Sequence, residues 1–202
     1  MKIPTLLRRA LPGLVLCLSA CGGSAEPPLS TLPSAGMAGQ RMTVVPVQRP
    51  GDYAADAENE MVYALERREG SATWIFPDEV RARLSRAPGL DAPVDALPVD
   101  VFLRAEVERV GDPLYGMLRR IAAVTDADRI LIPVGVSYRP ERETEDGEVE
   151  ESAVQVLAAV VDVLTGRVQW LGVAEGDADG ADDPGGLPRA MEALAATLLP
   201  AG

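Results

Sequence analysis

Residues 129–174 read RILIPVGVSYRPERETEDGEVEESAVQVLAAVVDVLTGRVQWLGVA, and this stretch decides the fold. From Ile130 to Tyr138 apolar residues alternate with other types, as expected of a strand with one face on a core. An acidic stretch, Glu141 to Glu151, follows this strand. Inside it, Asp146-Gly147 is a strong signal for a hairpin turn. The first half of the stretch therefore predicts a strand that ends in an acidic hairpin.

The second half predicts two more strands. Val154 to Val163 is nearly continuous in apolar residues, which indicates a return strand buried on both faces. Thr165-Gly166 marks another tight turn, and Val168 to Ala174 suits a third strand. Since side chains alternate along a strand, we expect Trp170 to be buried on the same face as Val168. Three strands joined by two turns predict an antiparallel meander.

Upstream of the meander, strand and helix patterns alternate. Met42 to Val47 suits a buried strand, and Thr73 to Phe76 suits a second short strand. Between them residues 54–69 suit a helix, with Gly70 at its C-terminal stop. Pro77 then suits the first position of another helix, because its missing N–H has no partner there in any case.

Three further segments complete the pattern. Val99 to Val110 fits the spacing of a helix and also that of a strand, and we prefer the helix. The next helix is expected over residues 112–126, with Asp112 as N-cap and Pro113 at the first position. A last amphipathic helix is expected over residues 187–199. The sequence thus predicts an α/β (α+β) domain: a mixed sheet with a C-terminal three-stranded antiparallel meander, and helices packed on it.

The N-terminus predicts an export signal. Basic residues at Lys2, Arg8 and Arg9 precede a short apolar run that is too short to span a bilayer. The run ends in Leu18-Ser19-Ala20-Cys21, which resembles the bacterial lipobox. This resemblance implies cleavage before Cys21 and acyl chains on that residue. The alternative is a secretory signal cleaved elsewhere, which would leave Cys21 as a spare thiol.

These patterns divide the chain into three parts. We expect a signal peptide over residues 1–20, a lipidated N-terminus and flexible tether over residues 21–41, and one globular domain over residues 42–200. Gly22 follows the cysteine, where aspartate commonly retains lipoproteins of this kind at the inner membrane. The expected location is therefore the outer membrane, facing the periplasm, with the bilayer bound through acylated Cys21.

Composition excludes several kinds of chemistry. The chain has no histidine and two cysteines, so it lacks the residues for a Ser-His-Asp triad, a histidine-ligated zinc site or a four-cysteine metal site. We expect no cofactor. The net charge is −12, and cleavage before Cys21 would remove three basic residues and make it −15. Such a charge disfavours nucleic acid as a partner.

One family resemblance spans about two thirds of the expected mature chain. An Asp-Ala-Asp loop at residues 126–128 precedes the first meander strand, and a Val-Asp-Val-Leu-Thr-Gly turn at residues 161–166 precedes Trp170 by four residues. These features, with Val44-Val45-Pro46-Val47, resemble the periplasmic fold of the TolB N-terminal domain, the curli-secretion lipoprotein and the lipoprotein activators of penicillin-binding proteins. The resemblance implies a tethered binding or assembly domain rather than a secretion pore.

The acidic hairpin is the candidate partner-binding site. A cluster of carboxylates can dock a basic partner, and it can equally keep a hairpin tip soluble and block edge pairing. The two roles are compatible. The candidate residues are Glu141, Glu143, Glu145, Asp146, Glu148, Glu150 and Glu151.

Three other sets of residues carry weaker candidates, each with a structural explanation that we prefer. Four aspartates of an acidic loop could bind calcium, but their spacing does not fit an EF-hand, and a solvated loop is favoured. Three aspartates near strand ends could act as acid and base on a glycan, but turn and helix capping explains them. Four aromatic residues could stack on a ligand, but core anchoring explains most of them. The three sets are Asp177, Asp179, Asp182 and Asp183; Asp126, Asp128 and Asp162; and Trp74, Tyr115, Tyr138 and Trp170.

The leading hypothesis is therefore a non-enzymatic envelope lipoprotein that binds another envelope component. Its alternatives are a carboxylate-dependent hydrolase of cell-wall glycan and a lipoprotein that binds a small ligand or metal. The sequence names neither the partner nor the oligomeric state.

Overall fold

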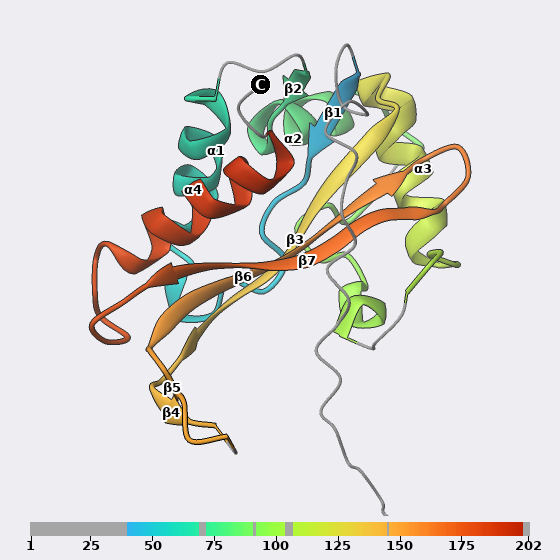
Figure 1. Cartoon of the computed structure of the whole chain (residues 1–202). Coiled ribbons are helices and arrows are strands. Elements are labelled where there is room, and N and C mark those ends of the chain that lie inside the picture. The colour runs from blue at the N-terminus through green and yellow to red at the C-terminus, as the bar shows by residue number, and fades with distance from the viewer. Residues whose placement is uncertain (1–39, 69–71, 91, 104–106, 145, 200–202) are drawn as a thin grey trace, which may run out of the picture.

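The computed structural model describes residues 40–68, 72–90, 92–103, 107–144 and 146–199. Its centre is a five-stranded mixed sheet with the strand order β2-β1-β3-β6-β7 (Figure 1). β1 pairs in parallel with both β2 and β3, and β3, β6 and β7 pair antiparallel in sequence. The predicted mixed sheet and meander are confirmed. The strands are β1 (Arg41–Val44), β2 (Thr73–Ile75), β3 (Arg129–Arg139), β6 (Ala153–Asp162) and β7 (Val168–Asp177).

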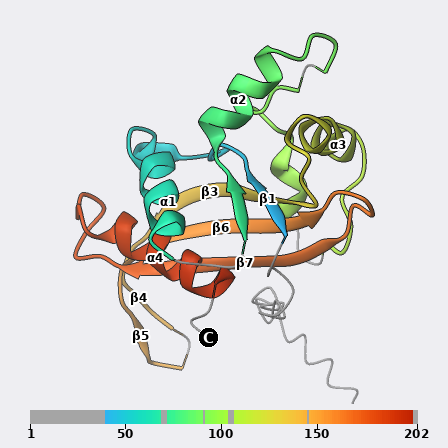
Figure 2. The same cartoon turned by 90° about the horizontal axis from the view of Figure 1, so that it is seen from above.

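Helices pack on both faces of this sheet. α1 and α4 lie beside each other over one face, where α4 contacts β7 and β6 (Figure 2). α2 and α3 contact each other and contribute to the core on the opposite face. The helices are α1 (Ala57–Glu66), α2 (Pro77–Ser85), α3 (Leu114–Thr125) and α4 (Gly186–Leu198), with short 3-10 helices η2 (Gly51–Tyr53) and η3 (Val99–Leu103).

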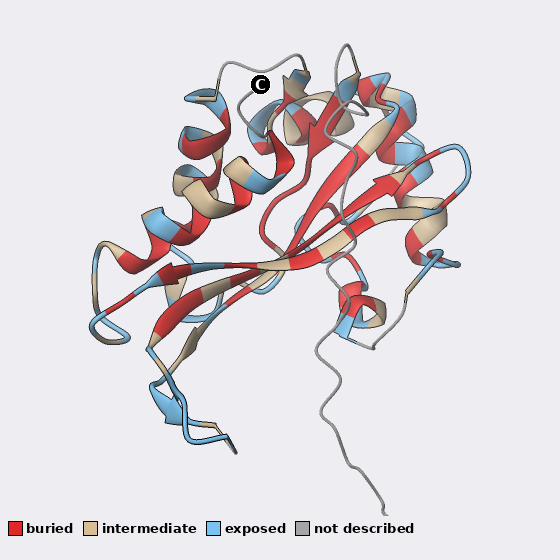
Figure 3. Cartoon of the chain, in the orientation of Figure 1, coloured by how far each residue is buried: buried red, intermediate tan, exposed pale blue. Residues whose placement is uncertain are grey.

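The sheet separates two hydrophobic cores, and β6 contributes to both. Val156 and Val160 point into the core under α1 and α4, while Ala159 and Val161 point into the core under α2 and α3. All four side chains are fully buried. The predicted burial of this strand on both faces is confirmed, and Figure 3 shows the buried centre of the sheet.

A β-bulge corrects one expectation about β7. Trp170 pairs with Val160, but Val168 pairs with Val161, so β7 has one extra residue between the two pairs. The extra residue shifts the alternation of side chains by one position, so that the residues on either side of the β-bulge point to different faces than a regular strand would give them. Trp170 is therefore buried under α1 and α4, whereas Val168 packs against the opposite core. The burial of Trp170 is confirmed, and its expected placement on the same face as Val168 is wrong.

The helix preferred for the segment from Val99 to Val110 is the second expectation that the structure corrects. Its first five residues form η3, and Val107–Val110 lies outside any helix. The backbone N–H of Val110 donates to Gly166 O at 2.9 Å, and that of Val168 donates to Glu108 O at 2.9 Å. Because the turn between β6 and β7 satisfies these backbone groups, this part of the chain runs as an extended segment beside it.

Helix boundaries differ from the expected ones by a few residues. Pro77 is the first residue of α2, as predicted. α3 begins at Leu114, so Pro113 stands just before the helix rather than at its first position. Asp112 nevertheless accepts a hydrogen bond from the N–H of Gly116 at 3.0 Å. A helix start leaves several N–H groups free, and Asp112 satisfies one of them from outside the helix.

Small residues explain why β7 runs past its expected end at Ala174. The strand continues to Asp177, and Gly172, Ala174 and Gly176 face the α4 side. A Cβ on Gly176 would lie 2.3 Å from the backbone nitrogen of Ala190 in α4. Helix and strand therefore meet backbone to backbone at this point, which only glycine allows.

Candidate functional site

The acidic hairpin projects from the end of the meander into solvent. Two short strands form it, β4 (Arg142–Glu143) and β5 (Val149–Glu150), and they pair with each other in a separate two-stranded sheet (Figures 1 and 3). Its carboxylate residues are exposed, apart from the half-buried Glu150. Glu145 lies outside the described residues. The tip of the hairpin is thus exposed to solvent where the structure describes it.

Glu150 differs from the other candidates because it joins the hairpin to the sheet. Its carboxylate pairs with Arg139 at 2.6 Å and with Arg142 at 2.8 Å. The hydrogen bond from Arg142 lowers the pKa of Glu150, against a smaller effect of burial, and the charges of both arginines lower it further. Arg139 also pairs with Glu175 of β7 at 2.9 Å. Glu150 is therefore engaged in a structural ion pair.

The base of the hairpin and the acidic loop after β7 meet around one hollow, which we call the acidic basin. Glu141 and Glu151 come from the hairpin, and Asp177 and Asp179 come from the end of β7 and the loop. The hollow has a volume of about 580 Å³ and is completed by Ser152, Ala178 and Arg189. Four carboxylates face a single arginine, which gives the basin an excess of negative charge. The sequence placed these two acidic segments apart and did not predict that they meet.

Local contacts fix the wall of the basin. The N–H of Ala178 donates to Ser152 O at 3.1 Å, and the Ser152 hydroxyl donates to Ala178 O in return. Arg189 of α4 donates to Asp177 O at 2.7 Å and pairs with Asp183. The loop that carries Asp177 and Asp179 is therefore held at both ends.

The acidic loop does not gather its aspartates around a cation position. Asp183 accepts hydrogen bonds from the N–H groups of Gly185 and Asp179, at 2.8 and 3.2 Å, and these lower its pKa. Asp177 and Asp182 are exposed. Among the described residues no three carboxylates come close enough together to hold a metal ion. The geometry thus gives the calcium hypothesis no support.

Asp126, Asp128 and Asp162 lie at one end of the sheet, each in a structural role. Asp126 ends α3 with a positive φ of 54° and pairs with Arg41. Asp128 is exposed, and its carboxylate accepts a long hydrogen bond of 3.4 Å from the N–H of Arg41. The side chain of Asp126 is 87% exposed, so no enclosed acid–base pair forms here. The hydrolase hypothesis gains no support from this arrangement.

Asp162 stabilises the turn between β6 and β7. One carboxylate oxygen accepts hydrogen bonds from the N–H of Leu164, the N–H of Thr165 and the Thr165 hydroxyl, at 3.1, 2.8 and 2.7 Å. Partial burial raises the pKa of Asp162, but these hydrogen bonds and the charge of Arg129 outweigh it and lower the pKa. The predicted capping role of Asp162 is confirmed.

The four aromatic candidates do not form a platform for a ligand. Trp170 is buried, and Trp74 and Tyr138 pack half-buried against the same core. Tyr115 packs against the opposite core, and its hydroxyl donates to Leu164 O at 2.8 Å. Core anchoring therefore explains these residues, as predicted.

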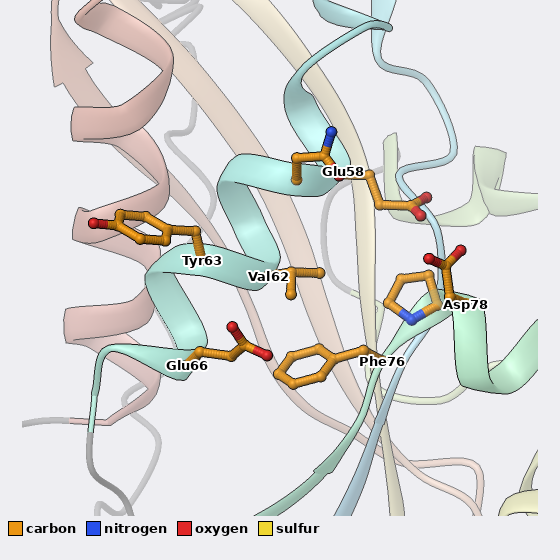
Figure 4. A pocket seen from close by; sticks show the side chains of 8 residues that line it. Glu58, Val62, Tyr63, Glu66, Phe76 and Asp78 are labelled. Carbon is orange, nitrogen blue, oxygen red and sulfur yellow. The ribbon is translucent and has the colours of Figure 1, made fainter.

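Sequence reasoning missed a second hollow, the α1–β2 cleft, which Figure 4 shows from close by. Val62, Phe76 and Pro77 line it, with Glu66 near one end and Glu58 and Asp78 near the other. Its volume is about 200 Å³. The signal in the sequence was an apolar pair, Val62-Tyr63, beside the buried stripe of α1. Tyr63, 55% exposed, also lines this cleft, but its side chain extends toward α4 and lines a neighbouring hollow of about 280 Å³ as well.

Comparisons with known proteins assign no function to the chain. No family model matches it, and no curated protein matches it. Among solved structures, it is similar to the LpoB C-terminal domain from Escherichia coli, with a TM-score of 0.40 and 17% identity over 69% of this chain and 83% of that one. A PelC dodecamer from Paraburkholderia phytofirmans gives a TM-score of 0.38 and 18% identity over 81% of this chain and 88% of that one. The hypothetical protein CT253 from Chlamydia trachomatis gives a TM-score of 0.32 and 13% identity over 72% of this chain and 78% of that one.

The candidate anchor, Leu18-Ser19-Ala20-Cys21, lies outside the described residues. Across residues 40–199, as far as they are described, no helix is long and apolar enough to cross a membrane.

Proposed function

We propose that the protein is an envelope lipoprotein, anchored through Cys21, whose domain binds a basic envelope protein without catalysing a reaction. The observation that carries the binding role is the acidic basin, where Glu141 and Glu151 of the hairpin meet Asp177 and Asp179. Complementary charge steers encounters with a partner and suppresses partners of like charge. A basic protein surface therefore suits the basin best.

The domain offers a rigid mount for such a surface. The hairpin continues from β3 and β6, and Arg139 connects it to β7 through Glu150 and Glu175. Arg189 connects the other wall to α4. Binding sites held on strands and helices lose less entropy on association than sites on free loops.

The anchor rests on the sequence of the lipobox. Stable membrane attachment takes two or more acyl chains, and the lipobox implies that Cys21 carries them. In the proposed location, the outer membrane, the acidic domain faces the periplasm. Metabolic labelling with a palmitate analogue tests this step: the wild type is labelled and Cys21→Ala is not. Equal labelling of the two proteins would refute the lipobox assignment.

The binding role is tested by removing the charge of the basin. The full chain is cross-linked in native envelopes and purified, and the recovered proteins are compared between variants. The basin variant should lose one basic partner that the wild type and an equally neutralised control both retain. Recovery of the same proteins with all three chains would exclude the basin as the docking surface. The basin variant is Glu141→Gln, Glu151→Gln, Asp177→Asn and Asp179→Asn; the control is Asp52→Asn, Asp56→Asn, Glu60→Gln and Glu108→Gln.

A further inference from the structure

We propose that the α1–β2 cleft is a second docking site, which takes the side chain of an arginine from a basic segment of a partner protein. The cleft is built from α1 and the end of β2, whereas the acidic basin is built from the hairpin, β7 and α4. The proposal therefore does not rest on the basin.

The floor of the cleft is apolar and held in place from below. Phe76 is half-buried and stacks on Trp74 of β2, with ring centroids 6.4 Å apart and an angle of 16° between the planes. Pro77 is buried as the first residue of α2, and Val62 is half-buried on α1. An arginine suits such a floor, because its aliphatic stem packs on apolar surface and its flat guanidinium stacks on an aromatic ring.

The rim of the cleft carries an excess of negative charge. Glu58, Glu66 and Asp78 line it, and none of the lining residues is basic. Arg81 binds Glu58 through both carboxylate oxygens, at 2.7 and 2.8 Å, and Asp78 at 3.0 Å. Since Arg81 contributes one positive charge against three carboxylates, two negative charges remain in excess.

Glu66 supplies the free carboxylate. It is exposed, and no arginine among the described residues pairs with it. Figure 4 shows its side chain directed toward Phe76 and Val62. A guanidinium that stacks on Phe76 can therefore reach this carboxylate, whereas an anionic ligand such as a phosphate would meet an excess of like charge.

Another lining residue of the cleft, Tyr63, already shows this pairing. The guanidinium of Arg67 lies over the ring of Tyr63, 5.4 Å from its centroid. A cation over an aromatic face is favourable by about 0.5–1 kcal/mol at exposed sites. Phe76 offers a second ring in the cleft, and no guanidinium lies over this ring in the described residues.

A peptide titration that is monitored by NMR tests the proposal. The probe is a seven-residue peptide of glycine and serine with one central arginine, added to the isotope-labelled full chain in detergent micelles. A matched peptide carries citrulline, which keeps the shape of arginine and lacks its charge. The arginine peptide should shift the amide signals of residues 58–66, Phe76 and Asp78, and the citrulline peptide should not.

Two variants locate the site. Glu66→Gln should weaken binding of the arginine peptide by about threefold to tenfold, the effect of losing one charge-assisted hydrogen bond. Glu143→Gln, at the hairpin tip, removes the same charge elsewhere and should leave binding at the cleft unchanged. Because both residues are exposed, both variants should fold, which far-UV circular dichroism verifies. Equal shifts with citrulline, equal binding by Glu66→Gln, or shifts confined to the acidic basin would each overturn the proposal.

Discussion

The indole of Trp170 lies over Gly172, two residues further along β7. A Cβ on Gly172 would lie 2.7 Å from Cζ2 of the ring, so the absence of a side chain at this position makes room for the indole. The bulge before Trp170 directs the ring into the core under α1 and α4, where it is 3% exposed. One bulge and one glycine together thus position the buried tryptophan of this core.

Trp170→Ala should lower the free energy of unfolding by about 3–5 kcal/mol, because it empties a large buried aromatic site. Urea unfolding followed by circular dichroism measures this loss. Gln169→Ala, at the half-buried neighbour on the bulge, is the control and should cost far less. A loss below about 1 kcal/mol for Trp170→Ala would contradict its burial, since ordinary surface substitutions have effects of that size.

Gly176→Ala should destabilise the contact between β7 and α4. Its Cβ would lie 2.3 Å from the backbone nitrogen of Ala190 and 2.5 Å from the carbonyl oxygen of Gly186, and backbone cannot move aside as a side chain can. Overpacking of this kind costs about 1–3 kcal/mol or more. Gly180→Ala is the matched control, because no atom lies within 4 Å of its Cβ position. Equal thermal stability of the two variants would show that α4 is not seated this closely.

The sequence predicted the meander and most helices because their signals are local. Alternation from Ile130 to Tyr138 and the turn at Thr165-Gly166 depend on neighbouring residues alone. The pattern over Val99 to Val110 fitted two periods equally, and the partner that decided it lies more than fifty residues away at Gly166. The bulge at Gln169 likewise depends on how β7 pairs with β6. A sequence pattern contains neither kind of information.

The candidate site was predicted in its parts but not in its assembly. The acidic residues of the hairpin and of the loop were visible as composition, whereas their meeting depends on β7 extending to Asp177. The α1–β2 cleft depends on Phe76 and α1 approaching each other after the chain crosses from β1 to β2. Both hollows depend on which elements become neighbours in space. The predicted order of elements along the chain did not determine these neighbours.

Thr125→Val should cost more than Thr43→Val, although both hydroxyls are fully buried. The Thr43 hydroxyl donates to Oγ1 of Thr125 at 2.8 Å, and the Thr125 hydroxyl donates to Ile121 O at 2.9 Å. Removing Thr125 leaves the Thr43 hydroxyl without this acceptor, at a cost of about 1–3 kcal/mol. Removing the Thr43 hydroxyl leaves the hydrogen bond from Thr125 to Ile121 O in place.

The double variant completes this test. With both hydroxyls replaced by methyl groups, no buried donor from the pair is left unpaired, so the double variant should be more stable than Thr125→Val alone. Chemical unfolding of the four proteins gives the coupling energy. Strict additivity of the two single losses would contradict the hydrogen-bonded pair.

Asp162 should make stability depend on pH in the acidic range. Its pKa is lowered in the folded state from the ordinary value of 3.8. A depressed pKa means that the ionised form stabilises the fold, so its contribution is present above pH 3.8 and is lost as the pH falls through the folded pKa. Asp162→Asn should therefore be less stable than the wild type at neutral pH, and the difference should shrink as the pH falls below this value. A difference that stays constant down to the lowest pH of urea unfolding would contradict the assignment.

The register of β3 and β6 allows the hairpin to be removed without disturbing the sheet. Arg139 faces Ala153 across the two strands, so the chain needs only a short turn to connect them. Replacing residues 141–151 by Asn-Gly leaves Pro140 and Ser152 on either side of the new turn, which makes a four-residue connection. Four-residue hairpin loops are common, and shorter loops cost less entropy to close. Ser152 also keeps its contacts with Ala178.

The free energy of unfolding of the shortened protein should lie within about 1 kcal/mol of the wild-type value. The deleted side chains that the structure describes are exposed, apart from those of Glu150 and Thr144. Arg139 loses Glu150 but keeps Glu175, so its charge retains a partner. The deletion also removes Glu141 and Glu151 from the acidic basin, and the pull-down should therefore lose the basic partner. Normal folding with full recovery of the partner would limit the hairpin acids to solubility. Loss of the fold would show that the hairpin stabilises β3 and β6 in a way that their pairing does not explain.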